Sequence, residues 1–225
     1  MADVKARKNK RGYDVVAATG VARAFYLRCY PELRQLIADA RASKPIFDIP
    51  AAIVLATNLT FACETYLKTA LYMNNRKTPD SHNLKKIYSE FNDHLKNEFS
   101  KNYALLISKL PEEIGVRLLA IQTVEPGGKF DDVDIAKIEE KERRAKVLPS
   151  FLGIVGDSYT SWRYSHQYHL GRVNQFEFHY YYLCIVCCMA DEYIRFRIRN
   201  DDKLDVNLAI LHPDDRFPMQ PKNFQ

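Results

Sequence analysis

Glycine and proline are scarce in this sequence, and long apolar runs are missing. Of 225 residues, 8 are Gly and 10 are Pro, which is few for the many tight turns of an all-β fold. No apolar run approaches the roughly 18 residues that cross a bilayer, and the charged N-terminus is followed by no apolar stretch of the kind found in secretory signals. These absences favour a soluble helical protein, and we expect a cytoplasmic location and no membrane partner.

Cysteine is also sparse, and its placement argues against disulfides and zinc. The five cysteines are an odd number, and Cys184, Cys187 and Cys188 share one apolar segment. This pattern is typical of reduced thiols in a cytoplasmic protein. Cys184 and Cys187 have Cys-x-x-Cys spacing, but no second pair completes a tetrahedral zinc site. We therefore interpret them as core residues and expect no metal.

Several enzyme signatures are missing as well. The only Gly-Gly pair is Gly127–Gly128, and no Lys-Ser or Lys-Thr follows it at the spacing of a phosphate-binding loop. Neither His-Glu-x-x-His nor Gly-x-Ser-x-Gly occurs. These absences argue against most cofactor-dependent and nucleotide-hydrolysing classes, so we expect no cofactor.

Positive charge is concentrated at the N-terminus. The net charge is +5, and most of it lies within residues 1–12, which leaves the rest of the chain close to neutral. Such an arm can touch phosphate through salt-sensitive contacts, but it is more often a disordered, solubilising end. We divide the chain into a disordered basic arm (1–12), a helical domain (13–200) and a C-terminal extension (201–225).

Apolar residues recur at spacings of three and four, which predicts an all-α helical bundle with long central helices. The strongest pattern covers residues 51–73. A helix over residues 13–42 is expected to break at Pro31, and the next helix is expected to begin with Ser81 as its N-cap. Asn174 is the expected N-cap of the last helix. Further helices are predicted over residues 99–110, 112–123, 149–164 and 175–199.

The remaining segments have no clear apolar period. Residues 125–134 are predicted to form an exposed loop. The charge-rich stretch 137–146 is typical of a solvated helical face or a mobile segment. The C-terminal extension is predicted to be a short irregular tail with a strand-like piece over residues 206–211.

Two groups of polar residues are candidates for a functional site. Glu64 precedes Lys68 by four positions, the favourable order for an ion pair along a helix. Because apolar residues flank this pair, Glu64 is expected to be partly buried and to need a second partner, for which an arginine from another helix is suited. His82 follows the predicted N-cap and either packs there or joins the site.

The second group lies within residues 162–169. At about 100° per residue, Arg163 and His166 share one helical face, whereas Arg163 and His169 converge only if the helix ends or bends between them. Arginine can hold a phosphate and histidine can move a proton at neutral pH, which is the chemistry of metal-independent RNA cleavage. On residue types alone, a structural cluster is the more frequent arrangement.

Three motifs in this order resemble the HEPN superfamily (higher eukaryote and prokaryote nucleotide-binding). They are Ala56-x6-Cys63-Glu64-x3-Lys68-x2-Leu71, then His82-Asn83-Leu84-x2-Ile87, then Arg163-Tyr164. The resemblance implies a bundle of four or five helices that forms a homodimer. Many such proteins are metal-independent endoribonucleases of toxin or defence type, with an arginine and a later histidine at the dimer interface, and others bind nucleotides without catalysis.

Mapped onto this chain, the resemblance implies that Arg163 stabilises the scissile phosphate and that His169, or alternatively His166, transfers protons. Glu64, Lys68, His82 and Tyr164 are the associated binding residues. Tyr164 stands where active members commonly have a polar residue, and non-catalytic relatives often carry Arg-Tyr there. Arg163 would then pair with Glu64 inside the fold.

Two hypotheses follow. The first is a homodimeric HEPN-like ribonuclease that acts on RNA through Arg163 and His169, with an antitoxin as a further partner. The alternative is a non-catalytic module that binds a nucleotide or a partner protein. It is motivated by the near-neutral body and by an aromatic run whose surplus suggests an interface. That run consists of Phe176, Phe178, Tyr180, Tyr181 and Tyr182.

Overall fold

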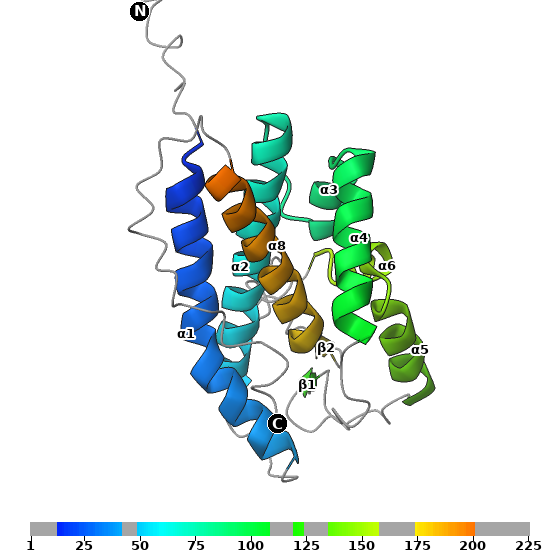
Figure 1. Ribbon diagram of the computed structural model, residues 1–225. Coiled ribbons are helices and arrows are strands. Elements are labelled where there is room, and N and C mark those ends of the chain that lie inside the picture. Colours follow the sequence, from blue (N-terminus) through cyan, green and yellow to red (C-terminus); the bar gives the residue numbers. More distant parts are fainter. Residues whose placement is uncertain (1–12, 42–48, 109–118, 124–134, 158–173, 201–225) are drawn as a thin grey trace, which may run out of the picture.

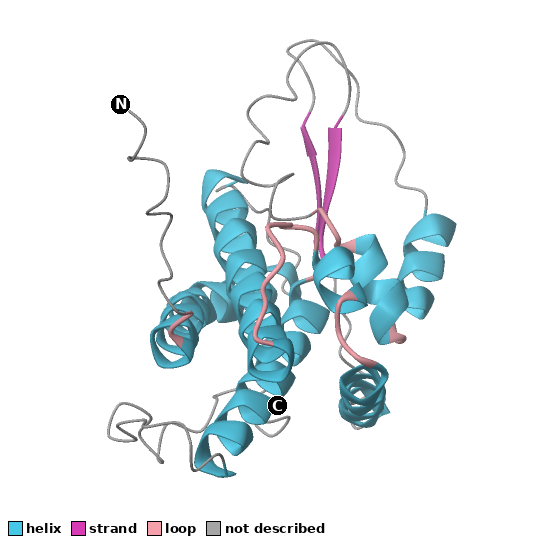
Figure 2. Ribbon diagram, turned by 90° about the horizontal axis from the view of Figure 1, so that it is seen from above, coloured by secondary structure: helices cyan, strands magenta, loops and turns pink. Residues whose placement is uncertain are grey.

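The fold is a helical bundle with a small two-stranded sheet beside it (Figures 1 and 2). The structure is a computed structural model that describes residues 13–41, 49–108, 119–123, 135–157 and 174–200. The predicted all-α bundle with long central helices is confirmed. The helices are α1 (Val15–Arg41), α2 (Ile49–Asn75), α3 (Leu84–Ser89), α4 (Asp93–Ser108), α5 (Ile135–Ala145), α6 (Leu148–Ile154) and α8 (Tyr180–Asn200). The strands are β1 (Leu119–Thr123) and β2 (Asn174–Phe178).

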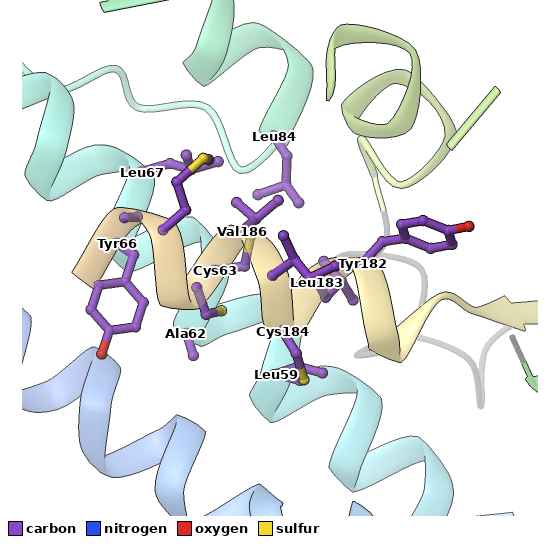
Figure 3. Close-up of a cluster of buried hydrophobic side chains, with 14 of the residues drawn as sticks. Leu59, Ala62, Cys63, Tyr66, Leu67, Leu84, Tyr182, Leu183, Cys184 and Val186 are labelled. Atoms are coloured by element: carbon purple, nitrogen blue, oxygen red, sulfur yellow. The ribbon is translucent and has the colours of Figure 1, made fainter. Parts of the chain in front are cut away.

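Helix α2 lies at the centre of the bundle and packs against α1, α3 and α8. Its apolar residues cover most of its circumference, so Leu59, Ala62 and Leu67 are fully buried. Figure 3 shows this set facing Leu183 and other side chains of α8. Each large apolar side chain buried in this way contributes about 1.5–3 kcal/mol, so packing rather than helix propensity holds α2 in place.

Helix α8 contributes the aromatic part of the core. Phe178, Tyr180, Tyr181 and Tyr182 are at most 3% exposed, and the Tyr182 ring centroid lies 5.5 Å from that of Phe151 on α6. These four of the five aromatic residues of the predicted run are therefore not available to a partner, and the side chain of Phe176 lies outside the described part of the chain. The four rings lie in the interior of the bundle, where such rings bury large apolar areas.

Helix α1 continues through Pro31, so the predicted break at this residue is wrong. Its axis bends in the second half of the helix (Figure 1). A proline removes one backbone hydrogen bond and crowds the preceding turn. Pro31 lies on the exposed side, where water can solvate the freed carbonyl, while packing of α1 on α2 keeps both halves helical.

The other end of α1 is tied to α2 by Tyr13, just before the helix. Its hydroxyl lies 2.9 Å from Thr69 Oγ1, and its ring stacks on Tyr72 with a centroid distance of 4.7 Å. Burial raises the pKa of Tyr13, so the hydroxyl stays neutral and can share this hydrogen bond at physiological pH.

The sheet pairs two segments predicted to be helical. β1 falls within the predicted helix 112–123, and β2 covers the start of the predicted helix 175–199; they pair antiparallel, with Leu119 opposite Phe178 and Thr123 opposite Asn174. Asn174 is therefore the first residue of a strand and not an N-cap. β1 has three apolar residues followed by two polar ones, and β2 alternates only from its second residue onward. Five positions are too short a window for helical and strand periods to be distinguished.

The other predicted helices and segments differ in outcome. The predicted helix 99–110 corresponds to α4, which begins earlier, at Asp93. The charged stretch 137–146 corresponds to α5. The predicted helix 149–164 is wrong in length, because α6 ends at Ile154 and Val155 is its C-cap. The predicted arm 1–12, the loop 125–134 and the extension 201–225 lie outside the described residues.

Candidate functional site

Glu64 lies on α2 with its side chain 4% exposed, and Lys68 lies one turn further along the helix. Lys68 Nζ is 2.9 Å from Glu64 Oε1, and its side chain is 17% exposed. The predicted ion pair between positions 64 and 68 is therefore confirmed, as is the partial enclosure of Glu64. A carboxylate this deeply buried needs strong donors to offset its lost hydration.

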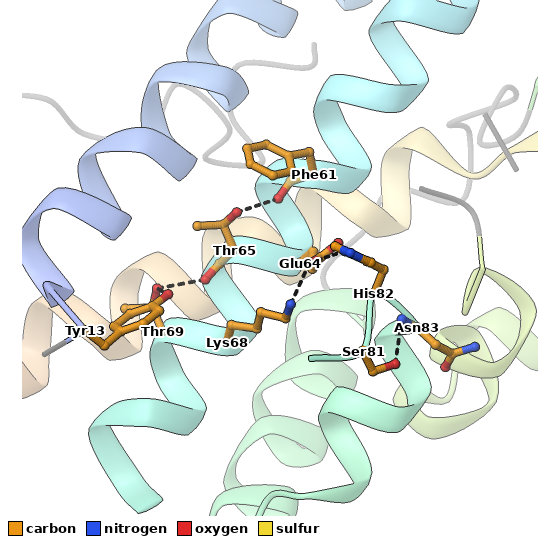
Figure 4. Close-up of polar contacts among 9 residues, drawn as sticks. All are labelled: Tyr13, Phe61, Glu64, Thr65, Lys68, Thr69, Ser81, His82 and Asn83. Carbon is orange, nitrogen blue, oxygen red and sulfur yellow. Dashed lines mark hydrogen bonds and ion pairs between the residues drawn. The ribbon is translucent and has the colours of Figure 1, made fainter. Parts of the chain in front are cut away.

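The second partner of Glu64 within the described residues is His82, not an arginine. His82 Nδ1 lies 2.9 Å from Glu64 Oε1 (Figure 4). The His82 side chain comes from the segment just before α3 and is 55% exposed. Two motifs separated by a turn region in the sequence thus meet at one oxygen atom.

The other oxygen of this carboxylate, Oε2, differs from Oε1 in its hydrogen bonding. Glu64 Oε2 is buried and has no hydrogen-bond partner among the residues that the structure describes. Both donors, Lys68 and His82, lie on Oε1. An unsatisfied buried polar group costs about 1–3 kcal/mol, and more when charged, so this arrangement is not the one that stability alone favours.

The start of α3 positions His82. Asn83, rather than the predicted Ser81, is the N-cap, and its Oδ1 accepts from Lys86 N at 2.9 Å. Ser81 Oγ instead accepts from Asn83 N at 3.1 Å. A serine two residues ahead can form such a local turn as readily as a cap, and this explains the misplaced cap.

Helix α6 and the residues after it support this segment from the other side. Leu84 N donates to Gly156 O at 2.9 Å, and Asn83 Nδ2 donates to Asp157 Oδ1 at 2.8 Å. A Cβ added at Gly156 would lie 2.9 Å from Asn83 Nδ2, so only glycine allows this close approach. The position of His82 therefore depends on two distant parts of the chain.

A second buried carboxylate, which the sequence analysis missed, lies between α2 and α8. Asp191 is 1% exposed; its Oδ1 accepts from Tyr66 Oη at 3.1 Å, and its Oδ2 lies 3.7 Å from Arg195 Nη1. Burial raises the pKa of Asp191, against the opposing effects of Tyr66, Arg195 and Arg23. The available signal was an acid four residues before an arginine within an apolar helix.

Two thiols of α8 lie in the core, as predicted, and the third, that of Cys188, is partly buried against it. Cys184 and Cys187 are fully buried, and burial raises the pKa of both well above the ordinary thiol value. Burial raises the pKa of Cys188 to about 12. Thiols in this state are poor nucleophiles. Within the described ranges, no three His, Cys, Asp or Glu side chains are arranged to hold a metal ion.

The predicted reacting residues Arg163, His166 and His169, together with Tyr164, lie outside the described residues. The description stops at Asp157 and resumes at Asn174. Of the predicted site residues, the structure therefore brings together Glu64, Lys68 and His82 and tests no other.

Comparison with known proteins identifies no relative of this chain. No protein-family model, curated protein or solved structure gives a significant match to the chain. In the described part of the chain, no helix has both the length and the apolar character needed to cross a membrane.

Proposed function

We propose that this protein is a HEPN-like, homodimeric endoribonuclease that cleaves RNA without a metal ion. The observation that carries the proposal is the convergence of two separate motifs: Lys68 and His82 both contact Glu64 Oε1 at 2.9 Å. The residues that led to the HEPN resemblance on α2 and before α3 thus form one cluster on a helical bundle.

The third motif follows closely in the chain. Asp157, the last described residue before it, is bonded to Asn83 beside His82. Arg163 comes six residues later, and six residues span at most about 20 Å. The chain length therefore permits Arg163 to approach the Glu64 cluster, as the proposal requires.

In the proposed reaction, the RNA supplies its own nucleophile. The 2′-hydroxyl oxygen attacks the adjacent phosphorus, its proton passes to a base, and the bond to the 5′-oxygen breaks as that oxygen gains a proton. The products are a 2′,3′-cyclic phosphate and a 5′-hydroxyl. Arg163 stabilises the charge on the phosphate, and His169, or alternatively His166, transfers the protons.

Cleavage of a mixed RNA pool in EDTA tests the proposal. We expect the wild type to cleave and to leave cyclic phosphate ends, Arg163→Ala to be inactive, and either His169→Ala or His166→Ala to lose at least about a hundredfold in rate. Circular dichroism checks that each variant is folded. Undiminished cleavage by Arg163→Ala would contradict the assigned site. If the wild type does not cleave RNA, the proposal that the protein is a ribonuclease is wrong.

The alternative, a non-catalytic binding module, has less support. Its motivation was an aromatic run open to a partner, and Phe178, Tyr180, Tyr181 and Tyr182 lie in the core. Thermal stabilisation by nucleotides, with no effect of RNA and no cleavage, is the result that would favour it.

A further inference from the structure

The outward face of α1 carries no charge over the first half of the helix. Helix α1 packs mainly against α2 and lies at the edge of the bundle (Figure 1). Between Val15 and Leu27 its one charged residue is Arg23, which is only 8% exposed. The outward face of a surface helix is normally charged, as on α5, where Glu139 and Arg143 are exposed. This stretch of α1 therefore lacks the charges that usually keep an exposed helix solvated.

The exposed residues of this face have the spacing of a helix-pairing seam. They recur alternately three and four residues apart, as do the a and d positions of a coiled coil. These residues, which we call the α1 seam, are Asp14, Ala17, Val21, Ala24, Arg28 and Pro31. Val21 is 44% exposed, and the alanines on either side of it are small enough for a second helix to come close. Helix α1 thus has an apolar strip that faces outward in addition to the one that packs in the core.

The uncharged surface extends from α1 onto α2. The ring centroid of Phe25 on α1 lies 4.8 Å from that of Phe61 on α2. Val54, two turns before Phe61, is 57% exposed. Between Ile49 and Leu67 the one charged residue is Glu64, which is buried. Few charges together with aromatic side chains are the composition of the core of a protein interface.

The two charged residues of the α1 seam select the partner. Asp14 and Arg28 are both exposed, and each lies two turns, about 10 Å along the helix axis, from Val21. A second copy of α1 that runs antiparallel, with Val21 of each copy at the two-fold axis, places Asp14 beside Arg28 of the partner subunit and the reverse. A parallel copy would place like charges together, which is unfavourable. The seam is therefore complementary to itself in the antiparallel direction, as a closed dimer requires.

We infer that two copies of this chain associate through the α1 seam, with their α1 helices antiparallel and Val21 of each copy at the two-fold axis. The uncharged surface around Phe25 and Phe61 widens the contact. The seam contains none of the residues assigned to RNA cleavage. The inference therefore goes beyond the proposed function, because two copies pair in this way with or without that activity.

Sedimentation of the full chain over a range of concentrations measures the association. We expect the wild type to form a dimer whose population rises with concentration. Val21→Glu sets two carboxylates against each other at the axis, so the Kd of its dimer is expected to rise at least about tenfold. The matched control is Val147→Glu, because Val147 is 55% exposed and precedes α6, away from α1. The Kd of the control is expected to stay within about twofold of the wild type.

An oxidative cross-link tests the position of the axis. In the inferred dimer, residue 21 of one copy lies beside residue 21 of the other, within the roughly 7 Å between Cα atoms that a disulfide allows. Mild oxidation of Val21→Cys is therefore expected to give a covalent dimer, and Val147→Cys is expected to give none. The wild type is the background control, because four of its thiols are buried and that of Cys188 is partly buried.

Charge reversal tests the antiparallel direction. Arg28→Glu sets an acid beside Asp14 of the partner subunit, and we expect its Kd to rise at least about fivefold. Adding Asp14→Lys restores opposite charges only in an antiparallel pair, so the double variant is expected to return to within about threefold of the wild type. Because Asp14 Oδ1 accepts from Ala17 N at 2.9 Å, circular dichroism checks that the double variant is folded. A Kd that stays raised in the folded double variant would contradict the inferred direction.

The outcomes separate this inference from the proposed ribonuclease. A monomeric wild type overturns the inference, and so does a dimer that Val21→Glu leaves intact and Val21→Cys fails to cross-link. In the second case the proposed homodimer stands and uses another surface. A dimer that behaves as expected but does not cleave RNA leaves the inference in place and contradicts the ribonuclease. Should Val21→Glu fail to fold, the cross-link and the charge reversal decide.

Discussion

The two carboxylates that are buried among the described residues, Asp191 and Glu64, have their partners distributed in opposite ways. Asp191 places one partner on each oxygen, Tyr66 on Oδ1 and Arg195 on Oδ2. Glu64 places two partners on one oxygen and none from the described residues on the other. The partners also differ in their access to water, since the side chain of Arg195 is 14% exposed and that of His82 is 55% exposed.

The two clusters also differ in how much of each reaches water, because Asp191 and both of its partners are enclosed, whereas Glu64 has one partner that is more than half exposed. Asp191 joins α2 to α8 in the core through the hydrogen bond from Tyr66, where breaking a buried polar contact is costly. Glu64, although buried on the central helix, contacts an imidazole that is half exposed to solvent. Two carboxylates of similar burial thus differ in the distribution of their partners over the two oxygens and in the exposure of those partners.

Alanine substitution of the two carboxylates is expected to show the largest effect. Asp191→Ala should lower the free energy of unfolding by about 3 kcal/mol, because it removes two polar contacts in the core, the hydrogen bond from Tyr66 and the ion pair with Arg195. Glu64→Ala should lower it by about 1–2 kcal/mol, because the half-exposed imidazole of His82 can return to water and because the substitution also removes Oε2, a buried acceptor with no described donor. Urea unfolding at pH 7 measures both, and equal losses would contradict the distinction.

A smaller effect is expected at Gly156, which supports the segment around His82. In Gly156→Ala the new Cβ would lie 2.9 Å from Asn83 Nδ2 and 3.2 Å from Leu152 O, so we expect a loss of about 1–2 kcal/mol and a shifted His82 resonance. The matched control is Gly20→Ala on α1, where a Cβ meets nothing within 4 Å. That change should raise stability by about 0.5–1 kcal/mol, and similar losses in both variants would show that the contact with Asn83 is unimportant.

The smallest effect is a difference in pH dependence. Burial raises the pKa of Asp191 in the folded state, so between the ordinary and the raised pKa the folded protein binds more protons than the unfolded chain, and stability falls as pH rises. Asp191→Asn removes this titration. The stability of the wild type relative to Asp191→Asn should therefore decline from about pH 4 upward and level off above the raised pKa. A relative stability that grows with pH would contradict the assigned direction.

The sequence predicted the helical class, the centrality of α2 and the ion pair of Glu64 with Lys68. These features depend on local spacing, which a regular helix converts directly into faces and neighbours. The path of α1 through Pro31 and the strands β1 and β2 escaped prediction because tertiary packing and long-range pairing override local preference there.

The candidate site was predictable only in part. Spacing connects Glu64 to Lys68, but no periodicity connects either residue to His82, which lies beyond a turn. The contact exists because α3 packs against α2 and α6. The Asp191 cluster was missed for the same reason, since its Tyr66 and Asp191 lie on helices far apart in the chain.

The pairing of β1 with β2 has a consequence for how the protein folds. It joins residues 119–123 to residues 174–178. The pairing therefore closes a long loop of the chain that contains α5 and α6. Closing a long loop lowers the conformational entropy of the chain before the contacts of the sheet can offset that loss. Contacts between residues far apart in the sequence therefore slow folding. We therefore expect α1, α2 and the sequence-local α3 and α4 to assemble early, and the pairing of β1 with β2 to form only in a late step.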